Sequence, residues 1–381
     1  MTQPRAEGAA YVYAPQLSRH VLREGHPMRP VRLQYAFDLL AAYGAFGDPR
    51  AMLVEPRAAT DDEIALFHDA DYAAAVRRYS EAGRDTGDGM RYGFAQQGDN
   101  PIYSGMYEAA ALATGASIVA ADLVADGTVR AAFSPAGGLH HAARGHASGF
   151  CVFNDPVVAI ERLRARGLRV AYVDIDAHHG DGVQAAFYDA ADVLTISVHE
   201  SGRYLFPGTG DADETGVGEG AGYAVNLPLA PFTGDAVYLE AFDAIVLPLL
   251  RAFAPDVLAT QLGVDSYASD PLTHLGLSTN GFIGCVERFA ALGVPWLAFG
   301  GGGYDLDAVA RCWALAYGVM LGREWDDAIP PQARASLAGP CLRDAPQAPE
   351  NEWTTHTRAF AQRSVEQLKA TVFPTHGLAR G

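Results

Sequence analysis

Short apolar runs alternate with longer helical patterns along this chain. The runs, rich in Val, Ile, Phe and Tyr, are Val129–Phe133, Val170–Val173, Val193–Val198, Val257–Leu262 and Trp296–Phe299. The helical patterns, rich in Ala and Leu, include Tyr107–Asp126, Pro156–Arg166 and Tyr238–Phe253. Strands that alternate with helices predict a parallel α/β sheet, and near-continuous apolar runs indicate strands covered on both faces. We therefore expect helices on both sides of one sheet.

Chemically versatile residues directly follow these runs. They are His140 and His141; Asp174, Asp176, His178 and Asp181; His199; Asp265; and Gly300–Gly303 with Tyr304. In open α/β sheets the ligand crevice lies beyond the carboxyl ends of the strands. Five separate loops therefore bring polar side chains to one edge of the predicted sheet.

Asp176, His178 and Asp265 form a candidate metal site. Asp176 and His178 are two residues apart at a strand end, so their side chains point to the same side. One imidazole and two carboxylates can hold a divalent metal and leave a position for water. This set suits Zn²⁺, with Fe²⁺ as the alternative. Each aspartate alone would be read as a helix cap or turn residue, but their combination with His178 and the His pair favours a metal site.

The adjacent pair His140 and His141 needs partners that fix the ring tautomers, usually carboxylates. Asp174 and Asp181 could supply one partner each. Two His–Asp dyads beside one metal suit hydrolysis, because one imidazole can handle the proton of the attacking water.

The four glycines Gly300–Gly303 let the backbone pass close to a ligand and aim the next side chain, Tyr304. A phenol there could donate a hydrogen bond to a carbonyl that becomes an oxyanion. A phosphate-binding loop is the alternative, but no GxGxxG register or lysine follows. The chain has a single lysine, Lys369, which leaves little scope for lysine catalysis.

Composition excludes several classes of protein. The 28 basic and 45 acidic residues give a net charge of −17, which argues against a nucleic-acid partner. The four cysteines are scattered and form no CxxC pair. The N-terminus lacks the apolar core of a signal peptide, and no apolar run approaches the roughly 20 residues of a membrane span. We expect a cytoplasmic protein without a membrane partner.

The motifs resemble those of the zinc-dependent histone deacetylase superfamily and, within it, the class I-like bacterial branch of acetoin utilization deacetylases. The matching segments are HPMRP (26–30), GDNP (98–101), GGLHHA (137–142), GFCVFND (149–155), YVDIDAHHGDGVQAAFY (172–188), FPGTGD (206–211), GVDSYASDPL (263–272) and GGGGYDLDAVARCW (300–313). The resemblance covers about residues 10–320 and implies an arginase/deacetylase-type three-layer α/β fold, with a central, mostly parallel sheet of about eight strands. We interpret 1–381 as a single catalytic domain in which the proline-rich segment from about 324 to 381, helical from about Thr354 to Val372, wraps back onto the core.

The resemblance also implies roles for the residues at the predicted edge. The implied zinc ligands are Asp176, His178 and Asp265. His141, paired with Asp181, would act as general base and then as acid, and His140, paired with Asp174, would give electrostatic support. Tyr304 would polarise the acyl carbonyl.

A narrow substrate tunnel and two potassium sites are implied as well. The substrate-binding residues would be Asp99, Gly149, Phe150, Phe206, Leu272 and Gly302. Phe150 and Phe206 would wall the tunnel, Asp99 would grip substrate backbone amides at the rim, and Arg32 would line an internal channel for the released acid. One structural K⁺ would use backbone carbonyls of Asp174, Asp176, His178 and Val198 with the side chains of Asp174 and Ser197, and a second would lie near Phe187, Val193 and Tyr223.

Two departures from the family pattern bear on partners. Eukaryotic class I members use basic residues to hold an inositol phosphate and a corepressor, but here those positions are Pro271 and Asp307, so no such partner is expected. Members selective for acetylated polyamines carry a glutamate where this chain has Leu272, and leucine favours an acyl-lysine side chain over a cationic polyamine.

The resemblance therefore implies zinc-dependent hydrolysis of Nε-acetyl-lysine, or another acyl-lysine, in a protein such as an acyl-CoA synthetase, releasing acetate and free lysine. An acetylpolyamine or other small-amide amidohydrolase with the same zinc site is the alternative. An arginase-like binuclear manganese hydrolase would need a further aspartate where Gly180 stands. A non-catalytic binding protein would be expected to have lost a ligand or Tyr304. The sequence leaves the oligomeric state open.

Overall fold

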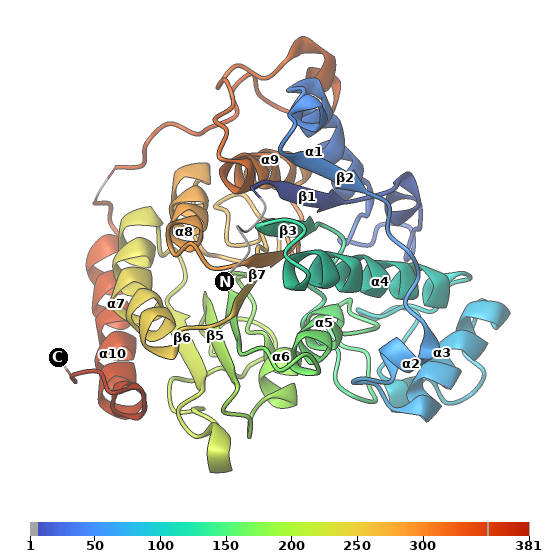
Figure 1. Cartoon of the computed structure of the whole chain (residues 1–381), viewed down its shortest axis with the longest axis horizontal. Coiled ribbons are helices and arrows are strands. Elements are labelled where there is room, and N and C mark those ends of the chain that lie inside the picture. The colour runs from blue at the N-terminus through green and yellow to red at the C-terminus, as the bar shows by residue number, and fades with distance from the viewer. Residues whose placement is uncertain (1–6, 349, 381) are drawn as a thin grey trace.

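An eight-stranded sheet forms the centre of the molecule (Figure 1). The computed structural model describes residues 7–348 and 350–380. Within them the strands follow the order β2-β1-β3-β8-β7-β4-β5-β6, and every neighbouring pair is parallel. The strands are β1 (Ala9–Val12), β2 (Ala51–Val54), β3 (Ala131–Ser134), β4 (Val170–Asp174), β5 (Val193–Glu200), β6 (Ala224–Leu229), β7 (Val257–Gln261) and β8 (Trp296–Phe299). The expected parallel sheet with helices is confirmed.

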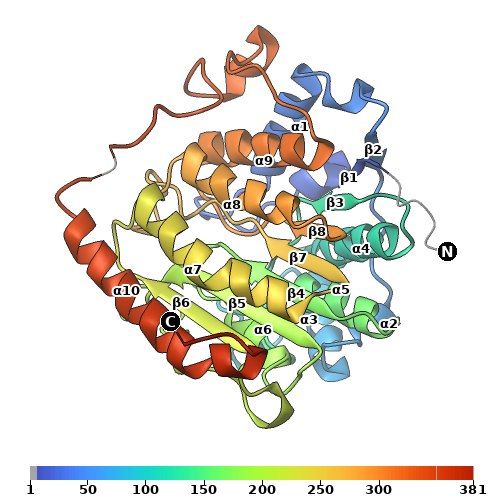
Figure 2. The same cartoon turned by 60° about the vertical axis from the view of Figure 1, so that its left-hand side comes forward.

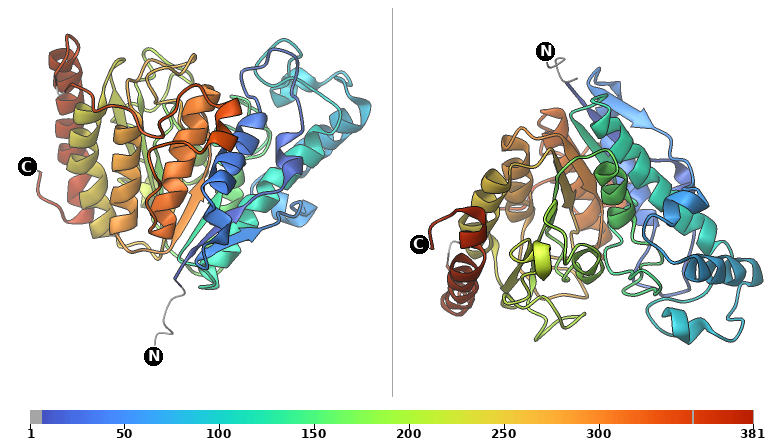
Figure 3. Two further views of the ribbon diagram at one scale, coloured as in Figure 1. Left: turned by 90° about the horizontal axis from the view of Figure 1, so that it is seen from above. Right: turned by 60° about the horizontal axis from the view of Figure 1, so that its bottom comes forward.

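Helices cover both faces of the sheet (Figure 3). They are α1 (Val31–Ala42), α2 (Asp61–Ile64), α3 (Ala70–Ala82), α4 (Met106–Ala125), α5 (Asp155–Arg164), α6 (Asp181–Ala186), α7 (Asp235–Phe253), α8 (Thr279–Ala291), α9 (Leu306–Leu321) and α10 (Thr354–Thr371). Short 3₁₀ helices occur at Pro15–Ser18, Ala45–Gly47, Gly89–Tyr92, Gly218–Gly220, Pro331–Ser336 and Phe373–His376. Buried side chains of α1, α7, α8 and α9 form one hydrophobic core, and those of α3, α4 and α5 form the other. Helix α10 packs against α7 and β6 (Figure 2).

The five strands expected from the sequence are present within two residues of their expected ends, and three further strands complete the sheet. Strand β1 has only four residues, two of them alanine, and strand β2 lies at an edge with Met52 and Leu53 exposed. Strand β6 carries Asn226 and Pro228, and proline is tolerated there because β6 is the other edge strand. Apolar periodicity is weak in such short or interrupted segments.

Helix α4 is the one helix in residues 7–348 and 350–380 that is long and apolar enough to cross a membrane. It packs against α3 and α5 and against strands β1 and β3, and 61% of its most apolar window is buried. Its composition is therefore explained by its place in the core.

One register aligns residues of six strands across the sheet, and four of these strands end in the aligned row. The aligned residues are Ser134, Phe299, Gln261, Asp174, Ser197 and Asn226. Strands β3, β8, β7 and β4 end there, whereas β5 and β6 continue to Glu200 and Leu229. The expected histidine pair, metal triad and Tyr304 lie in the loops after β3, β4, β7 and β8, whereas Arg32 lies in α1 and Asp99 precedes α4.

Candidate active site

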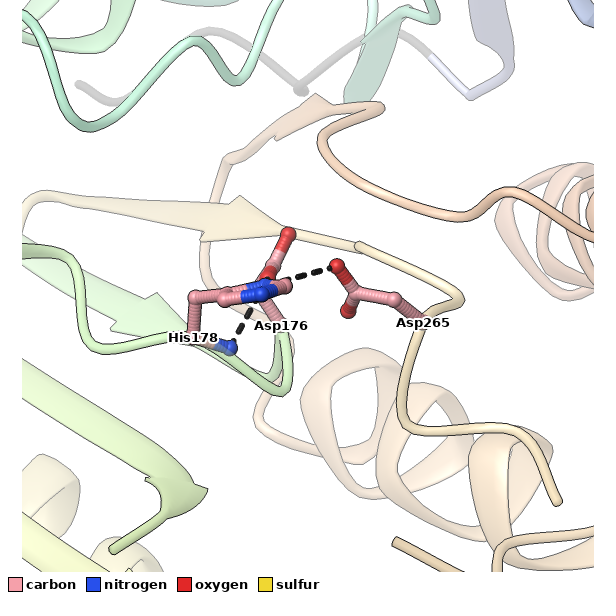
Figure 4. A group of neighbouring side chains, drawn as sticks. All are labelled: Asp176, His178 and Asp265. Atoms are coloured by element: carbon pink, nitrogen blue, oxygen red, sulfur yellow. Dashed lines mark hydrogen bonds and ion pairs between the residues drawn. The ribbon is translucent and has the colours of Figure 1, made fainter. Parts of the chain in front are cut away.

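Asp176, His178 and Asp265 converge beyond the ends of two neighbouring strands (Figure 4). Asp176 and His178 follow β4, and Asp265 follows β7. One ligand atom from each residue lies within 4.8 Å of the others, and all three residues are buried. The His178 Nδ1 atom is 3.0 Å from Asp176 Oδ1 and 3.0 Å from Asp265 Oδ2.

Surrounding donors fix the two carboxylates. The Gln261 side chain donates to Asp176 Oδ2 at 2.7 Å, the Gly302 backbone N–H donates to the same oxygen at 2.8 Å, and the Ala177 N–H donates to Asp265 Oδ1 at 2.7 Å. A side chain at Gly302 would collide with the Asp265 carboxylate. The role of Gln261 was not foreseen; its signal was a polar residue at the end of an apolar run.

The buried carboxylates create a need for positive charge. Burial, reinforced by the neighbouring charge of Asp176, raises the pKa of Asp265 to about 8. Two buried carboxylates this close cannot both stay ionised unless a cation compensates them. The donor set and its charge therefore fit a divalent metal ion.

The two adjacent histidines pair with the two aspartates left over from the triad. His140 Nδ1 lies 2.7 Å from Asp174 Oδ2, and His141 Nδ1 lies 2.7 Å from Asp181 Oδ1. Their Nε2 atoms are 3.0 Å apart. The carboxylates of Asp174 and Asp176 overcome burial and raise the pKa of His140 to about 9. Burial, and then the charge of His140, lowers the pKa of His141 to about 4. The carboxylates thus favour the charged form of His140, and burial favours the neutral form of His141.

The turn that carries the histidine pair is held from α5. Asn154, which caps α5, donates its side-chain amide to the carbonyls of His140 at 3.1 Å and Ala142 at 2.9 Å. The Asp155 carboxylate accepts hydrogen bonds from the backbone of Gly138 at 3.0 Å and Leu139 at 2.9 Å. Both lie in the GFCVFND motif, but sequence reasoning gave them no role.

Tyr304 follows β8 and lies against the aromatic ring of Phe150, with 5.7 Å between the ring centroids. Its backbone N–H donates to Asp270 Oδ2 at 2.7 Å, and the other oxygen of Asp270 accepts from the Leu272 N–H at 2.9 Å. Burial, then the charges of Asp265 and Asp176, raises the pKa of Tyr304 well above its usual value. The phenol therefore keeps its proton and can donate it in a hydrogen bond. Asp270, which ties Tyr304 to Leu272, was another residue that sequence reasoning did not single out.

Two phenylalanines flank this group from opposite sides. The Phe206 ring lies 5.0 Å from the His141 ring and 6.3 Å from the His178 ring, and 43% of the residue is exposed. Phe150 has a left-handed backbone, with φ of 69°, which a bulky residue adopts only at a cost. Between the walls, a side chain at Gly149 would collide with the His141 imidazole. Because His141 and Phe206 lie so close to residue 149, only glycine fits there.

Asp99 lies exposed, and its carbonyl accepts a hydrogen bond from His26 Nε2 at 3.1 Å. The Met28 N–H donates to His26 Nδ1 at 3.1 Å, so the proton of His26 is on Nε2. The His26 ring also packs edge-on against Phe150 at 4.7 Å. His26 is buried and links the Asp99 segment to the Phe150 wall.

Arg32 is buried and borders an internal cavity of about 70 Å³ that Leu139, Phe150 and Met28 also line. Its guanidinium donates to the carbonyls of Gly301 at 2.6 Å and Gly303 at 2.9 Å. Its Nε atom is buried without a partner among the described residues. The channel role of Arg32 stays a prediction.

Of the residues expected to bind potassium, Asp174 and Ser197 lie side by side in register on β4 and β5. The Ser197 hydroxyl lies 2.8 Å from His199 Nδ1, and the Val198 carbonyl accepts from the Tyr238 hydroxyl at 3.3 Å. In the second group, the Phe187 carbonyl accepts from the Ala190 N–H at 3.0 Å, the Tyr223 carbonyl accepts from the Thr195 N–H at 2.9 Å, and Val193 begins β5. Both potassium sites stay predictions.

Comparison with known proteins identifies the family to which the chain belongs. The model of the histone deacetylase domain matches residues 26–320. The acetoin utilization protein AcuC of Bacillus subtilis is 41% identical over 331 residues, which cover 85% of each chain. Histone deacetylase 2 of Oryza sativa is 38% identical over 331 residues, which cover 87% of this chain and 65% of the rice protein. The crystal structure of a histone deacetylase homologue from Aquifex aeolicus shares 30% identity with a TM-score of 0.85, covering 94% of this chain and 100% of that one. The fold is thus the arginase/deacetylase fold, and the chain belongs to the histone deacetylase family.

Proposed function

We propose that this deacetylase-family hydrolase is a zinc-dependent protein lysine deacetylase. It would hydrolyse Nε-acetyl-lysine, or another acyl-lysine, and release the acid and a free lysine. The observation that carries the proposal is the meeting of the Asp176–His178–Asp265 triad with the His141–Asp181 dyad. The fold of the family supports amide hydrolysis.

Zinc is the metal that we propose for the triad. One imidazole nitrogen and two carboxylates are three protein ligands that can hold Zn²⁺ and leave a position for water, with Fe²⁺ as the alternative. When bound there, Zn²⁺ would polarise the acyl oxygen and lower the pKa of the attacking water. Asp176 and Asp265 are held ready for the ion by Gln261, Gly302 and Ala177.

The side chains of this chain would then move the protons. His141, neutral and oriented by Asp181, takes the proton of the attacking water and afterwards gives a proton to the leaving lysine amine. His140, charged and paired with Asp174, stabilises the negative charge that develops in the transition state. The Tyr304 phenol donates a hydrogen bond to the acyl oxygen as that oxygen gains charge.

The walls of the site suit a neutral, extended acyl-lysine. Phe150 and Phe206 would enclose the aliphatic stem, and Leu272 adds an apolar group where a carboxylate would favour a polyamine. Asp99 would bind backbone amides of the protein substrate at the rim. The released acid would enter the cavity beside Arg32, whose guanidinium suits a carboxylate.

The proposal also includes a protein substrate and a cellular location. An acyl-CoA synthetase is the proposed protein substrate, in keeping with the likeness to an acetoin utilization protein. The four cysteines are all free, which fits the reducing cytoplasm as the proposed location. Potassium ions at the two carbonyl-rich sites would be structural.

A single screen tests the function. Zinc-loaded protein is given peptides with acetyl-, propionyl- and butyryl-lysine, and acetylspermidine is included. We expect acyl-lysine hydrolysis with much weaker acetylspermidine hydrolysis. Faster turnover of acetylspermidine would favour a small-amide amidohydrolase, and two manganese ions per chain in a metal analysis would favour an arginase-like enzyme.

A further inference from the structure

A second pocket, of about 390 Å³, opens beside the proposed substrate tunnel. Its walls include Phe232, from the loop between β6 and α7, and Trp353, which directly precedes α10. The two rings stack with 4.8 Å between centroids and 28° between planes. Phe232 is 46% exposed and Trp353 is 44% exposed, so the pair presents an open aromatic surface.

Phe232 holds this place at a cost in backbone strain. Its φ of 66° lies in the left-handed region, which bulky side chains rarely adopt. Core packing does not explain the residue, since nearly half of it is exposed. Its N–H donates to the His274 carbonyl at 2.7 Å, which fixes the loop against the 270–276 turn. Strained residues that persist on a surface are commonly functional.

The pocket lies at the same edge of the sheet as the metal triad. Phe232 follows the carboxyl end of β6, and α10 begins beside the first turns of α7 (Figure 2). Thr273 and His274 line the pocket and come directly after Leu272. Two residues of extended chain span at most about 7 Å. The Asp270 carboxylate ties Leu272 to Tyr304, so the pocket adjoins the proposed tunnel mouth.

The described residues that line the pocket include no aspartate or glutamate, but acidic residues lie on neighbouring segments. Among its described lining residues none is lysine or arginine. Glu350 and Glu352 are exposed on the segment that bounds it, although Glu350 also lies 3.8 Å from Arg358. Behind the pocket, the buried Glu200 carboxylate accepts from the His274 N–H at 2.8 Å. The exposed faces of the two aromatic rings can themselves attract an organic cation, most strongly the face of Trp353.

We propose that this pocket binds a lysine or arginine side chain of the protein substrate, two to four residues from the acyl-lysine. This inference rests on the proposed deacetylase function. The cation stacks on Trp353 and Phe232 while the acyl-lysine occupies the tunnel. A chain of net charge −17 attracts basic segments in general, and the aromatic pocket would bind one cationic side chain of such a segment.

The test uses matched acetyl-lysine peptides. One pair carries arginine or norleucine three residues before the acetyl-lysine, and a second pair carries them three residues after it. A capped acetyl-lysine amide has no flanking residues. We expect kcat/KM for one arginine peptide to exceed that of its norleucine partner by about threefold to tenfold, the range of a partly exposed cation–π contact.

Two variants locate the effect. Trp353→Ala removes the better cation–π surface, and Phe232→Gly removes the ring while relieving the left-handed strain, so the second variant keeps the fold. Both should abolish the arginine preference and leave kcat/KM for the capped amide unchanged. Met52→Ala removes a partly exposed side chain from β2, the opposite edge strand, and should retain the preference.

The outcomes separate the two proposals. Equal rates for arginine and norleucine peptides in the unaltered protein, or an undiminished preference in Trp353→Ala, overturn the pocket while capped-amide hydrolysis upholds the deacetylase function. A fall in molar mass in Trp353→Ala shows an interface between two copies and also overturns the pocket. No hydrolysis of the capped amide or of any peptide overturns both proposals.

Discussion

The neighbouring imidazoles of His140 and His141 lie in unlike electrostatic surroundings. His140 faces the carboxylates of Asp174 and Asp176, and its pKa rises to about 9. His141 is buried against that positive charge, and its pKa falls to about 4. A proton acceptor is therefore held beside a fixed positive charge. Tyr304 completes the set as a donor whose proton is retained by burial.

This division of roles predicts the effect of removing single groups. His141→Ala deletes the base, and Tyr304→Phe deletes only the phenol hydroxyl. Each change should lower kcat for an acetyl-lysine peptide by at least about a hundredfold, since each removes a group acting in the transition state. Circular dichroism and zinc content should match the unaltered protein. Near-native turnover in either variant would contradict the proposed roles.

At the scale of elements, the strand ends and the loops that follow them hold different parts of the site. Strand ends hold Asp174 and Gln261 in register, and the loops beyond carry the triad and Tyr304. The glycine-rich loop after β8 must pass against the Asp265 carboxylate, and Gly302 makes that passage feasible.

Replacing Gly302 should therefore loosen the metal site. In Gly302→Ala the new methyl group displaces the Asp265 carboxylate, and we expect zinc affinity to fall by about tenfold or more, as for other changes around metal ligands. Gly47→Ala is the matched control, because a side chain there meets open space. Competition with a chelator measures both variants. Equal zinc retention in the two variants would show that the loop can adjust.

The helices and strands also show most clearly which parts of the fold and the site can be predicted from the sequence. The apolar runs predicted β3, β4, β5, β7 and β8, and the polar residues that directly follow these runs predicted the triad. The pairing of His140 with Asp174 and of His141 with Asp181 was implied by resemblance, and the distances agree. Strands β1, β2 and β6 are short, at an edge, or interrupted by proline.

The supporting residues were missed for a different reason. Gln261, Asp155 and Asp270 act through hydrogen bonds to backbone or side chains that are distant in sequence or beyond a turn. A single sequence gives no pattern for such contacts, since any polar residue near a strand end or helix start could serve as a cap. Only the folded chain identifies which donor each carboxylate meets.

The whole molecule must stabilise a cluster of buried negative charge. Asp174, Asp176 and Asp265 are each less than 2% exposed. His178 and His140 compensate part of this charge. A cation bound at the triad would compensate the rest, and its binding would then be linked to folding stability.

Metal removal should thus destabilise the fold. A ligand that binds only the folded state adds about 2.7 kcal/mol at a free concentration one hundred times its Kd. We expect Tm to fall on chelation and to recover when Zn²⁺ is added. Asp265→Asn should show a much smaller response to zinc. A Tm independent of chelator would mean that the triad holds no ion in the folded protein.

Acid should destabilise the fold through His68. Burial lowers the pKa of His68 to about 4, and its ring accepts from the Asn154 N–H at 2.9 Å, a bond that requires the neutral form. Between pH 6.5 and 4 the unfolded chain binds more protons at this residue than the folded chain, so the free energy of unfolding falls as pH falls. The full loss from this residue is roughly 3 kcal/mol.

The variant His68→Gln cannot titrate, so its free energy of unfolding should depend less steeply on pH in this window. His356→Gln, at an exposed position on α10, is the control and should follow the unaltered protein. Urea titrations at pH 7 and pH 5 supply the comparison. An unchanged slope in His68→Gln would assign the acid sensitivity to other groups.

The aligned row of strand ends has a consequence for how such a protein can diversify. The row is anchored by backbone ladders on both sides, whereas the segments 202–215 and 271–276 lie outside the named strands. Lengthening or exchanging these segments would reshape the entrance while the reaction centre keeps its coordinates. Grafting the 230–234 and 271–276 segments from a relative, with Asp270 kept in place, should therefore transfer substrate preference while Tyr304 and the metal triad keep their positions.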